Sequence, residues 1–263
     1  MAGLALVLFF LLMAVFGPWV APRDPLKQQL DGSLAGPSWN HGLGRDELGR
    51  DILSRILYGA RISLGMALGA CLIAAGAGVT VGLVAAYRGG VLEEILMRAV
   101  DVVLAFPGFL LAIAVVSALG PGIANVAIAV GVNTMPGFAR IAHSTAHAVK
   151  ETDHVAAALA LGNSGPRILW RHILPNCLAP IVVQFTLRMG TVVVIGSGLS
   201  FLGLGAQPPS PEWGAMLSTA REYLRTAPHL SLVPGLAILL LVLGWNLLGD
   251  GLTEALNPKL SRS

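Results

Sequence analysis

The chain has 263 residues, of which 55% are hydrophobic and 12% are charged, and its mean hydropathy is +0.74. Soluble domains carry about 25% charged residues, so this composition excludes an ordinary soluble protein. The net charge of +3 is small and spread along the chain, which does not suggest nucleic-acid binding. The two cysteines, Cys71 and Cys177, indicate no disulfide framework.

Six apolar stretches are long enough to cross a bilayer, since a hydrocarbon core of about 30 Å needs about 20 apolar residues. The first has no basic residue before it and is longer than the apolar part of a signal peptide, so we expect a retained span. We therefore predict an all-α membrane protein with six transmembrane helices. The expected spans are Gly3–Val20, Ile62–Ala86, about Leu92–Leu119, Ile123–Ile141, Ala179–Leu204 and Leu232–Leu248.

An even number of spans places both termini on the same side as the polar segment 142–178. Residues 21–61 and 205–231 then lie on the opposite side. Lysine and arginine are in slight excess around 142–178, which favours that side as cytoplasmic. We therefore predict that both termini are cytoplasmic.

Proline and glycine interrupt several of the predicted spans, at Pro107-Gly108, Pro136-Gly137 and Gly196–Gly198. Such residues kink helices, both in static packed bundles and in bundles that rock between two states. The sequence contains no internal repeat of the kind found in many secondary transporters.

The segment 151–175 is polar and is predicted to form two short helices around a glycine turn. Thr152 is a candidate N-cap, Asp153 suits the positive end of the helix dipole, and Gly162 supplies a stop. Ser164 can cap the second helix, and Pro175 is predicted to end it. Helices this short are marginal alone in water. A soluble partner that docks on the segment is favoured over an amphipathic hairpin on lipid headgroups.

No catalytic constellation is found in the sequence. There is no G-x-x-x-x-G-K-[ST] loop, so ATP hydrolysis, if used, must take place on another polypeptide. His143 and His147 have a chelating i,i+4 spacing but no third ligand nearby, so no metal site is predicted. Arg98 and Asp101 are expected to form an intrahelical ion pair.

Arg188 falls about nine residues into the fifth predicted span, about 13 Å deep at 1.5 Å per residue. A charge at that depth costs about 2.5–3.5 kcal/mol on insertion scales and usually faces a cavity or a partner. Two roles stay open. Arg188 either lines a translocation path and contacts an anionic group such as a peptide carboxylate, or it makes a structural pair.

The segment 151–175 resembles the coupling loop of binding-protein-dependent ABC importer permeases. Two alanines, Ala157 and Ala158, are followed by Gly162 and by Ile173-Leu174-Pro175. In that family the loop seats in a cleft of a cytoplasmic ATPase. This chain has Ala156 where the family usually has glutamate, which leaves polar contacts to Asp153 and Arg171.

Further motifs resemble those of dipeptide, oligopeptide and nickel permeases, over about residues 18–258. They are Leu43-Gly-Arg-Asp-Glu-Leu-Gly-Arg-Asp51, Arg98-Ala-Val-Asp101, Phe106-Pro107-Gly108, Leu199-Ser-Phe-Leu-Gly-Leu-Gly205 and Asn246-Leu-Leu-Gly-Asp250. The external residues Trp213 and Tyr223 could pack at the membrane surface or against a docked binding protein.

The resemblance implies a type I ABC importer permease fold similar to that of the methionine transporter. It divides the chain into a first span with a periplasmic segment (1–60), a transmembrane domain (61–250) and a short cytoplasmic tail (251–263). The implied partners are a second permease subunit, two ATPase subunits that bind ATP-Mg, and a substrate-binding protein, all at a bacterial or archaeal cytoplasmic membrane. The implied substrates are peptides, nickel or metal chelates. The alternatives are an ion-coupled secondary transporter, which would need buried carboxylates, and a membrane-embedded enzyme.

Overall fold

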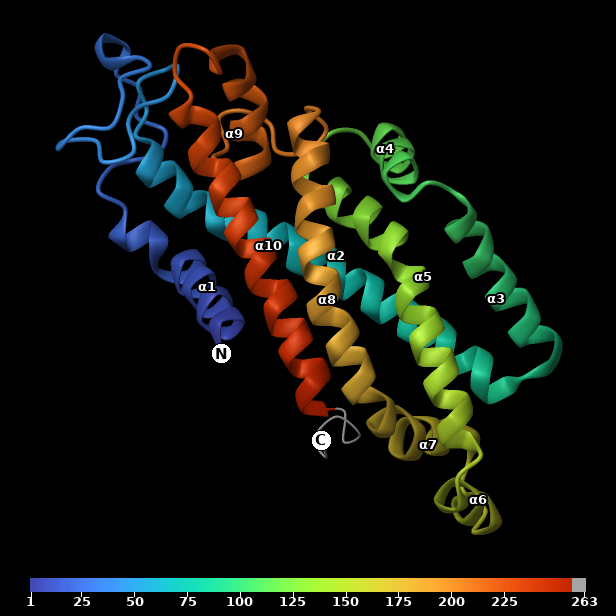
Figure 1. The fold of residues 1–263 in the computed structure, drawn as a ribbon. Helices are drawn as coiled ribbons and strands as arrows, with labels where there is room; N and C mark the ends of the chain where they lie inside the picture. Colours follow the sequence, from blue (N-terminus) through green and yellow to red (C-terminus); the bar gives the residue numbers. More distant parts are fainter. Residues whose placement is uncertain (257–263) are drawn as a thin grey trace.

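The computed structural model describes residues 1–256, which form helices and connecting loops without a β-strand. The long helices lie side by side in an oblique bundle (Figure 1). In chain order the α-helices are α1 (Ala2–Val20), α2 (Ile52–Arg88), α3 (Gly90–Ala105), α4 (Gly108–Leu119), α5 (Ile123–Lys150), α6 (Asp153–Ala160), α7 (Gly165–Ile168), α8 (Leu174–Phe201), α9 (Trp213–Ala220) and α10 (His229–Leu256). Of the predicted tail 251–263, residues 251–256 belong to α10 and the remainder lies outside the described residues.

Helix α2 is the central element and is longer than predicted. It begins at Ile52 instead of Ile62, because Asp51 caps it by accepting the backbone N–H of Ser54 at 2.9 Å. Its 37 residues span about 55 Å, well beyond a bilayer core of about 30 Å. It runs obliquely behind α10, α8 and α5 in Figure 1. Part of α2 therefore extends beyond the length that a bilayer core would cover.

Glycines allow α2 and α5 to pack closely. A Cβ added to Gly78 would lie 2.5 Å from the carbonyl oxygen of Met135, and one added to Gly82 would overlap the carbonyl of Ala139. Small residues are the usual means of helix association where lipid offers no hydrophobic driving force. Gly78 and Gly82 therefore form the place of closest approach between α2 and α5.

The third predicted span is not one straight helix. Helices α3 and α4 are bent by 95° at Phe106-Pro107, where proline cannot continue the helix. Helix α3 stands away from the bundle at one edge of Figure 1. Within residues 1–256, four helical segments are long and apolar enough to cross a membrane, or five if α3 and α4 form one broken span. Helix α5, which carries several polar side chains, does not meet this test.

The predicted helix end at Pro175 is wrong. Helix α7, a single π-helical turn at 169–173 and α8 follow one another without a break, and Pro175 lies in the first turn of α8. Proline at this position lacks the N–H that would bond the preceding turn, and the π-helical turn lies directly before it, where the regular bonding pattern is already interrupted. The fifth span is thus directly continuous with the second half of the segment 151–175.

Loops and short helices at one end of the bundle form a compact cap, named the external cap after the side on which the sequence predicts residues 21–61 and 205–231 to lie. Residues 21–51 and 205–228 contribute to it, and α9 packs on α8 and α10. Trp213 is completely buried and donates from its indole nitrogen to the carbonyl of Ile56 at 3.1 Å. This burial excludes Trp213 from contact with a docked protein and makes it an anchor between α9 and α2.

Candidate functional site

Helix α6 begins and ends where the sequence predicts. Thr152 occupies the N-cap position, but its hydroxyl donates to the carbonyl of Val149 at 2.5 Å and caps no first-turn N–H. At the other end, Gly162 adopts φ +76°, and its N–H bonds the carbonyl of Leu159 while Asn163 N–H bonds that of Ala158. This pair of bonds is a Schellman motif, which requires the left-handed conformation that glycine adopts without strain.

The two faces of α6 differ in accessibility. Val155 and Ala158 are buried against the bundle, whereas Asp153 and Ala157 are exposed. Ala158, predicted as part of the coupling contact, instead packs α6 onto its own chain. Exposed Asp153 and Ala157 stay candidates for contact with another protein.

The second half of the segment presents a basic ridge. Ile168 and Ile173 are fully buried, and Arg171 lies on the exposed side with Arg167 one turn before it. Of the remaining predicted residues, Leu174 is half-buried and Pro175 is exposed.

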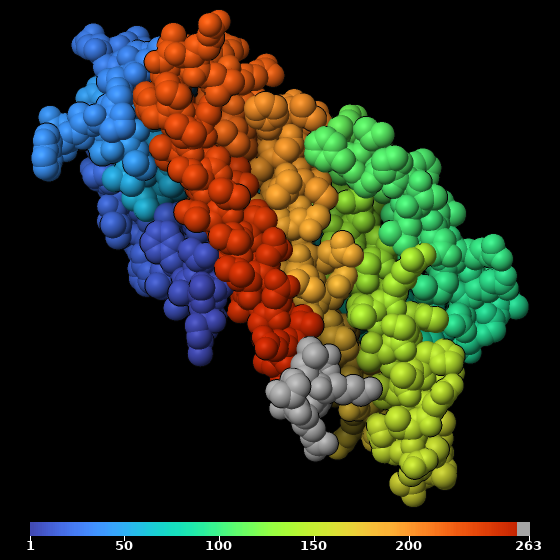
Figure 2. Space-filling view, viewed as in Figure 1, coloured from blue at the N-terminus to red at the C-terminus, as the bar shows by residue number. Residues whose placement is uncertain are grey.

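Large apolar side chains are exposed along the same segment. Leu159, Leu161 and Trp170 are 52%, 83% and 61% exposed. In Figure 2 this end of the molecule protrudes beyond the bundle, at the end opposite the external cap. Exposed apolar groups on a protrusion are typical of an interaction surface.

Lys150 fastens this segment to α2. Its ammonium group donates to the carbonyl oxygens of Ala86 at 3.1 Å and Tyr87 at 3.0 Å, the last turn of α2. A cation is favourable at a helix C-terminus, where carbonyl groups lack partners. The Tyr87 ring in turn packs against Gly165 at the start of α7. Sequence analysis missed Lys150, because no local pattern shows that residue 150 reaches residue 86.

Arg188 lies half-buried on α8, where it faces α5. Its guanidinium is 3.1 Å from the position that a Cβ of Gly137 would take, and Gln184 borders the same position at 3.1 Å. Within residues 1–256 the guanidinium has no ion-pair partner. The absence of a side chain at Gly137 thus makes room for the only arginine of α8.

The predicted pair of Arg98 and Asp101 is replaced by two other pairs. Arg98 contacts Glu94 at 3.3 Å, one turn earlier in α3, while Asp101 receives Arg140 of α5 at 2.7 Å. The i,i+4 partner and the neighbouring helix both compete with an i,i+3 contact.

The histidine pair on α5 also points to separate partners. His143 contacts Glu93 at 2.6 Å, and His147 lies 3.5 Å from Glu151. Over the part of the chain that the structure describes, no three metal-ligating side chains gather in one place.

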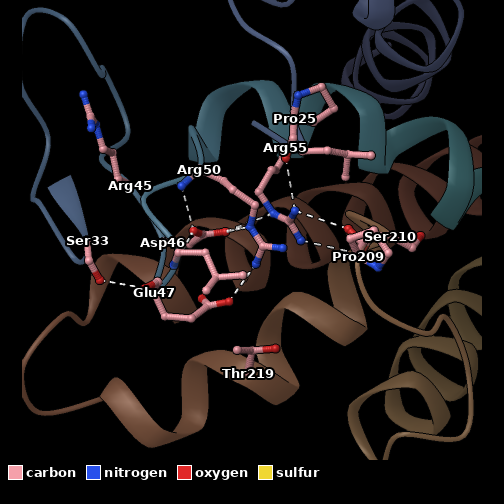
Figure 3. A network of polar contacts seen from close by, with 12 residues as sticks. Pro25, Ser33, Arg45, Asp46, Glu47, Arg50, Arg55, Pro209, Ser210 and Thr219 are labelled. Carbon is pink, nitrogen blue, oxygen red and sulfur yellow. Dashed lines mark hydrogen bonds and ion pairs between the residues drawn. The ribbon is translucent and has the colours of Figure 1, made fainter. Parts of the chain in front are cut away.

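A buried ionic cluster ties the external cap together (Figure 3). Arg50 contacts Asp46 and Glu47, each at 2.6 Å, and Arg55 lies 3.4 Å from Asp46. The Arg55 guanidinium also donates to the carbonyls of Pro25 at 3.2 Å and Pro209 at 3.4 Å. The cluster therefore joins the 21–51 segment, the start of α2 and the 205–212 loop.

A second external group surrounds the α2 cap. Burial would raise the pKa of Asp51, but hydrogen bonds from Ser54 and from His41, whose Nδ1 is 2.8 Å from the carboxylate, outweigh burial and lower it. Burial raises the pKa of Glu212, and this effect outweighs the hydrogen bonds from the backbone N–H groups of Gly214 and Ala215, which lower the pKa. These two carboxylates hold the N-terminal ends of α2 and α9.

Comparison with known proteins identifies the family. Residues 78–262 match the family described as "Binding-protein-dependent transport system inner membrane component", and residues 1–37 match the "N-terminal TM domain of oligopeptide transport permease C". The first match covers well over half of the chain. The chain belongs to this family.

Similar curated proteins agree with this assignment over nearly the full chain. A dipeptide transport system permease protein from Alkalihalophilus pseudofirmus is 45% identical over 98% of this chain and 85% of its own length. A glutathione transport system permease protein from Escherichia coli is 48% identical over 99% and 86%, and a di/tripeptide permease from Pseudomonas aeruginosa is 42% identical over 100% and 89%.

Solved structures with the same fold come from more distant transporters. The permease of an inward-facing methionine ABC transporter superimposes with a TM-score of 0.62 at 17% identity, over 77% of this chain and 96% of that one. A chain of an amino acid ABC transporter gives a TM-score of 0.58 at 13% identity. The expected helical fold, similar to that of the methionine transporter, is confirmed.

Proposed function

We propose that this transmembrane permease subunit of an ABC importer transmits ATP-driven motion through segment 151–175. The observation that carries the proposal is the protruding segment, with its exposed Leu159 and Leu161 and its attachment to α2 by Lys150. ATP-Mg would bind and be hydrolysed on two separate ATPase subunits. Because α7 continues into α8, a force on the segment would reach the transmembrane bundle without an intervening flexible loop.

The proposed assembly also contains a second permease subunit and a substrate-binding protein on the external side. Helix α5 would be the fourth span in chain order and would bring the total to six, with its polar side chains facing protein or water instead of lipid. Segment 151–175 and both termini would then be cytoplasmic in a bacterial membrane, and the cap around Arg50 and Trp213 would be external. Binding of ATP and of the loaded binding protein would favour different states of the bundle.

The proposed substrates are short peptides. The similar permeases are named for dipeptides, di/tripeptides and glutathione, and none of those three names refers to nickel. Arg188 is proposed to line the translocation path and to contact a peptide carboxylate. Its half-exposed guanidinium beside Gly137 and Gln184 fits that role better than a structural pair within the chain.

Reconstitution of the whole complex in vesicles tests the function. We expect uptake of a labelled dipeptide to require ATP and the binding protein. Uptake driven by a proton or sodium gradient without ATP would support an ion-coupled secondary transporter instead.

A matched pair of variants tests Arg188 in the same vesicles. Arg188→Gln should reduce uptake while the complex stays assembled, whereas Arg225→Gln on the external surface should have no effect. If Arg188→Gln destabilises the complex and leaves uptake per complex unchanged, Arg188 is a structural residue.

A further inference from the structure

A groove lies between the end of α2 and the turn formed by α7 and the π-helical residues. Its volume is about 550 Å³, within the range of about 300–1,000 Å³ for small-molecule sites. Its walls are formed by Val84, Tyr87, Arg88, Pro166, Leu169 and Trp170. The proposed function leaves this groove without a role.

The polar groups that line the groove are hydrogen-bond donors or can act as donors. Arg88 and Trp170 are exposed, and Tyr87 is half-buried. Within residues 1–256 the Arg88 guanidinium, the Tyr87 hydroxyl and the Trp170 indole nitrogen have no hydrogen-bond partner, and no acidic side chain lines the groove. Guanidinium and indole groups cannot accept hydrogen bonds. The fitting ligand therefore carries a negative charge and acceptor oxygens.

The remaining walls are apolar and adjoin the membrane. Val84 belongs to the apolar run of α2, which ends where Tyr87 and Arg88 begin. Tryptophan and tyrosine are enriched at the boundary between membrane and water, and cationic pockets near that boundary attract anionic headgroups. From this combination of donors and apolar wall, we infer that the groove binds an anionic phospholipid.

The surroundings favour a negative headgroup at this helix end. Carbonyl groups at a helix C-terminus repel anions, but here Lys150 already occupies those of Ala86 and Tyr87. A soluble partner is a less suitable occupant, because the protruding helix α6 lies farther from the bundle than the end of α2 (Figure 1). A bound lipid would connect α2 to α7 and so link segment 151–175 to the membrane surface.

Lipid binding can be measured without transport. The complex, purified with its partner subunits, is placed in phosphatidylcholine nanodiscs with and without phosphatidylglycerol, and the retained phosphatidylglycerol is counted by native mass spectrometry. Arg88→Gln should weaken retention about fivefold, the effect of one arginine at an anionic surface, and Trp170→Ala should weaken it further. Arg225→Gln, which removes an exposed arginine at the external end, should match the wild type.

Three results would overturn the inference. Equal retention by Arg88→Gln, Arg225→Gln and the wild type would exclude a role for the groove. Displacement of phosphatidylglycerol by inorganic phosphate would show a site for small anions instead of lipid. Labelling of Trp170→Cys by a thiol reagent only after removal of the ATPase subunits would show that a protein covers the groove. Gel filtration of each variant complex confirms that assembly is intact.

Discussion

Replacing Gly162 by proline should separate ATP hydrolysis from transport. Gly162 adopts φ +76°, and its N–H bonds the carbonyl of Leu159 at 2.9 Å. Proline fixes φ near about −65° and has no N–H, so the Schellman motif cannot form. A Cβ at position 162 meets no described atom within 4 Å, so a small side chain such as that of alanine costs free energy only through the backbone.

The backbone origin of the effect predicts a graded series. Alanine should cost about 1–2 kcal/mol, the usual penalty of the left-handed conformation, while asparagine tolerates that conformation and should behave nearly as wild type. Helix α6 has only eight residues and would be marginal without its C-terminal motif.

The assay compares ATPase activity and dipeptide uptake of the same reconstituted complex. Gly162→Pro should retain assembly and basal ATPase activity but lose uptake, with Gly162→Ala in between and Gly162→Asn as the control. Normal uptake by the proline variant would refute a coupling role for this segment.

Four further predictions concern other parts of the structure. Gly82→Ala should lower the stability of the complex by about 1–3 kcal/mol, because the added methyl group would overlap the backbone of α5. Gly76 faces open space, so Gly76→Ala should leave the stability unchanged. Thermal unfolding in detergent compares the two variants. Lys150→Met should cost about 1.5–3 kcal/mol in the same measurement by leaving two α2 carbonyls unpaired, and an unchanged melting temperature would disprove that attachment. Because the pKa of Asp51 is lowered in the folded protein, its ionised carboxylate stabilises the fold at pH values above the ordinary pKa of 3.8, and this stabilisation is lost as the pH falls below that value. The melting temperature should therefore fall more in wild type than in Asp51→Asn between about pH 5 and about pH 3. Ala156→Glu should leave uptake intact or increase it, since this side chain is exposed; lost uptake would show that the surface tolerates no carboxylate there.

Local patterns in the sequence were sufficient to predict several features of this protein. Hydropathy predicted the apolar helices, and glycine at position 162 with Thr152 upstream predicted the bounds of α6. The motifs from Leu43 to Asp250 indicated the family that the comparisons confirm. These features depend on residues within one or two turns of each other, where backbone preferences and the need to bury apolar surface act directly.

Contacts between distant segments were decided only by the tertiary structure. The sequence did not show that Lys150 binds the end of α2, that Asp101 pairs with Arg140 on another helix, or that Trp213 is buried. It also did not show the 95° bend between α3 and α4, because proline permits a kink without fixing its angle. Such outcomes depend on which helices pack together and at what distance, and that geometry results from the whole bundle at once.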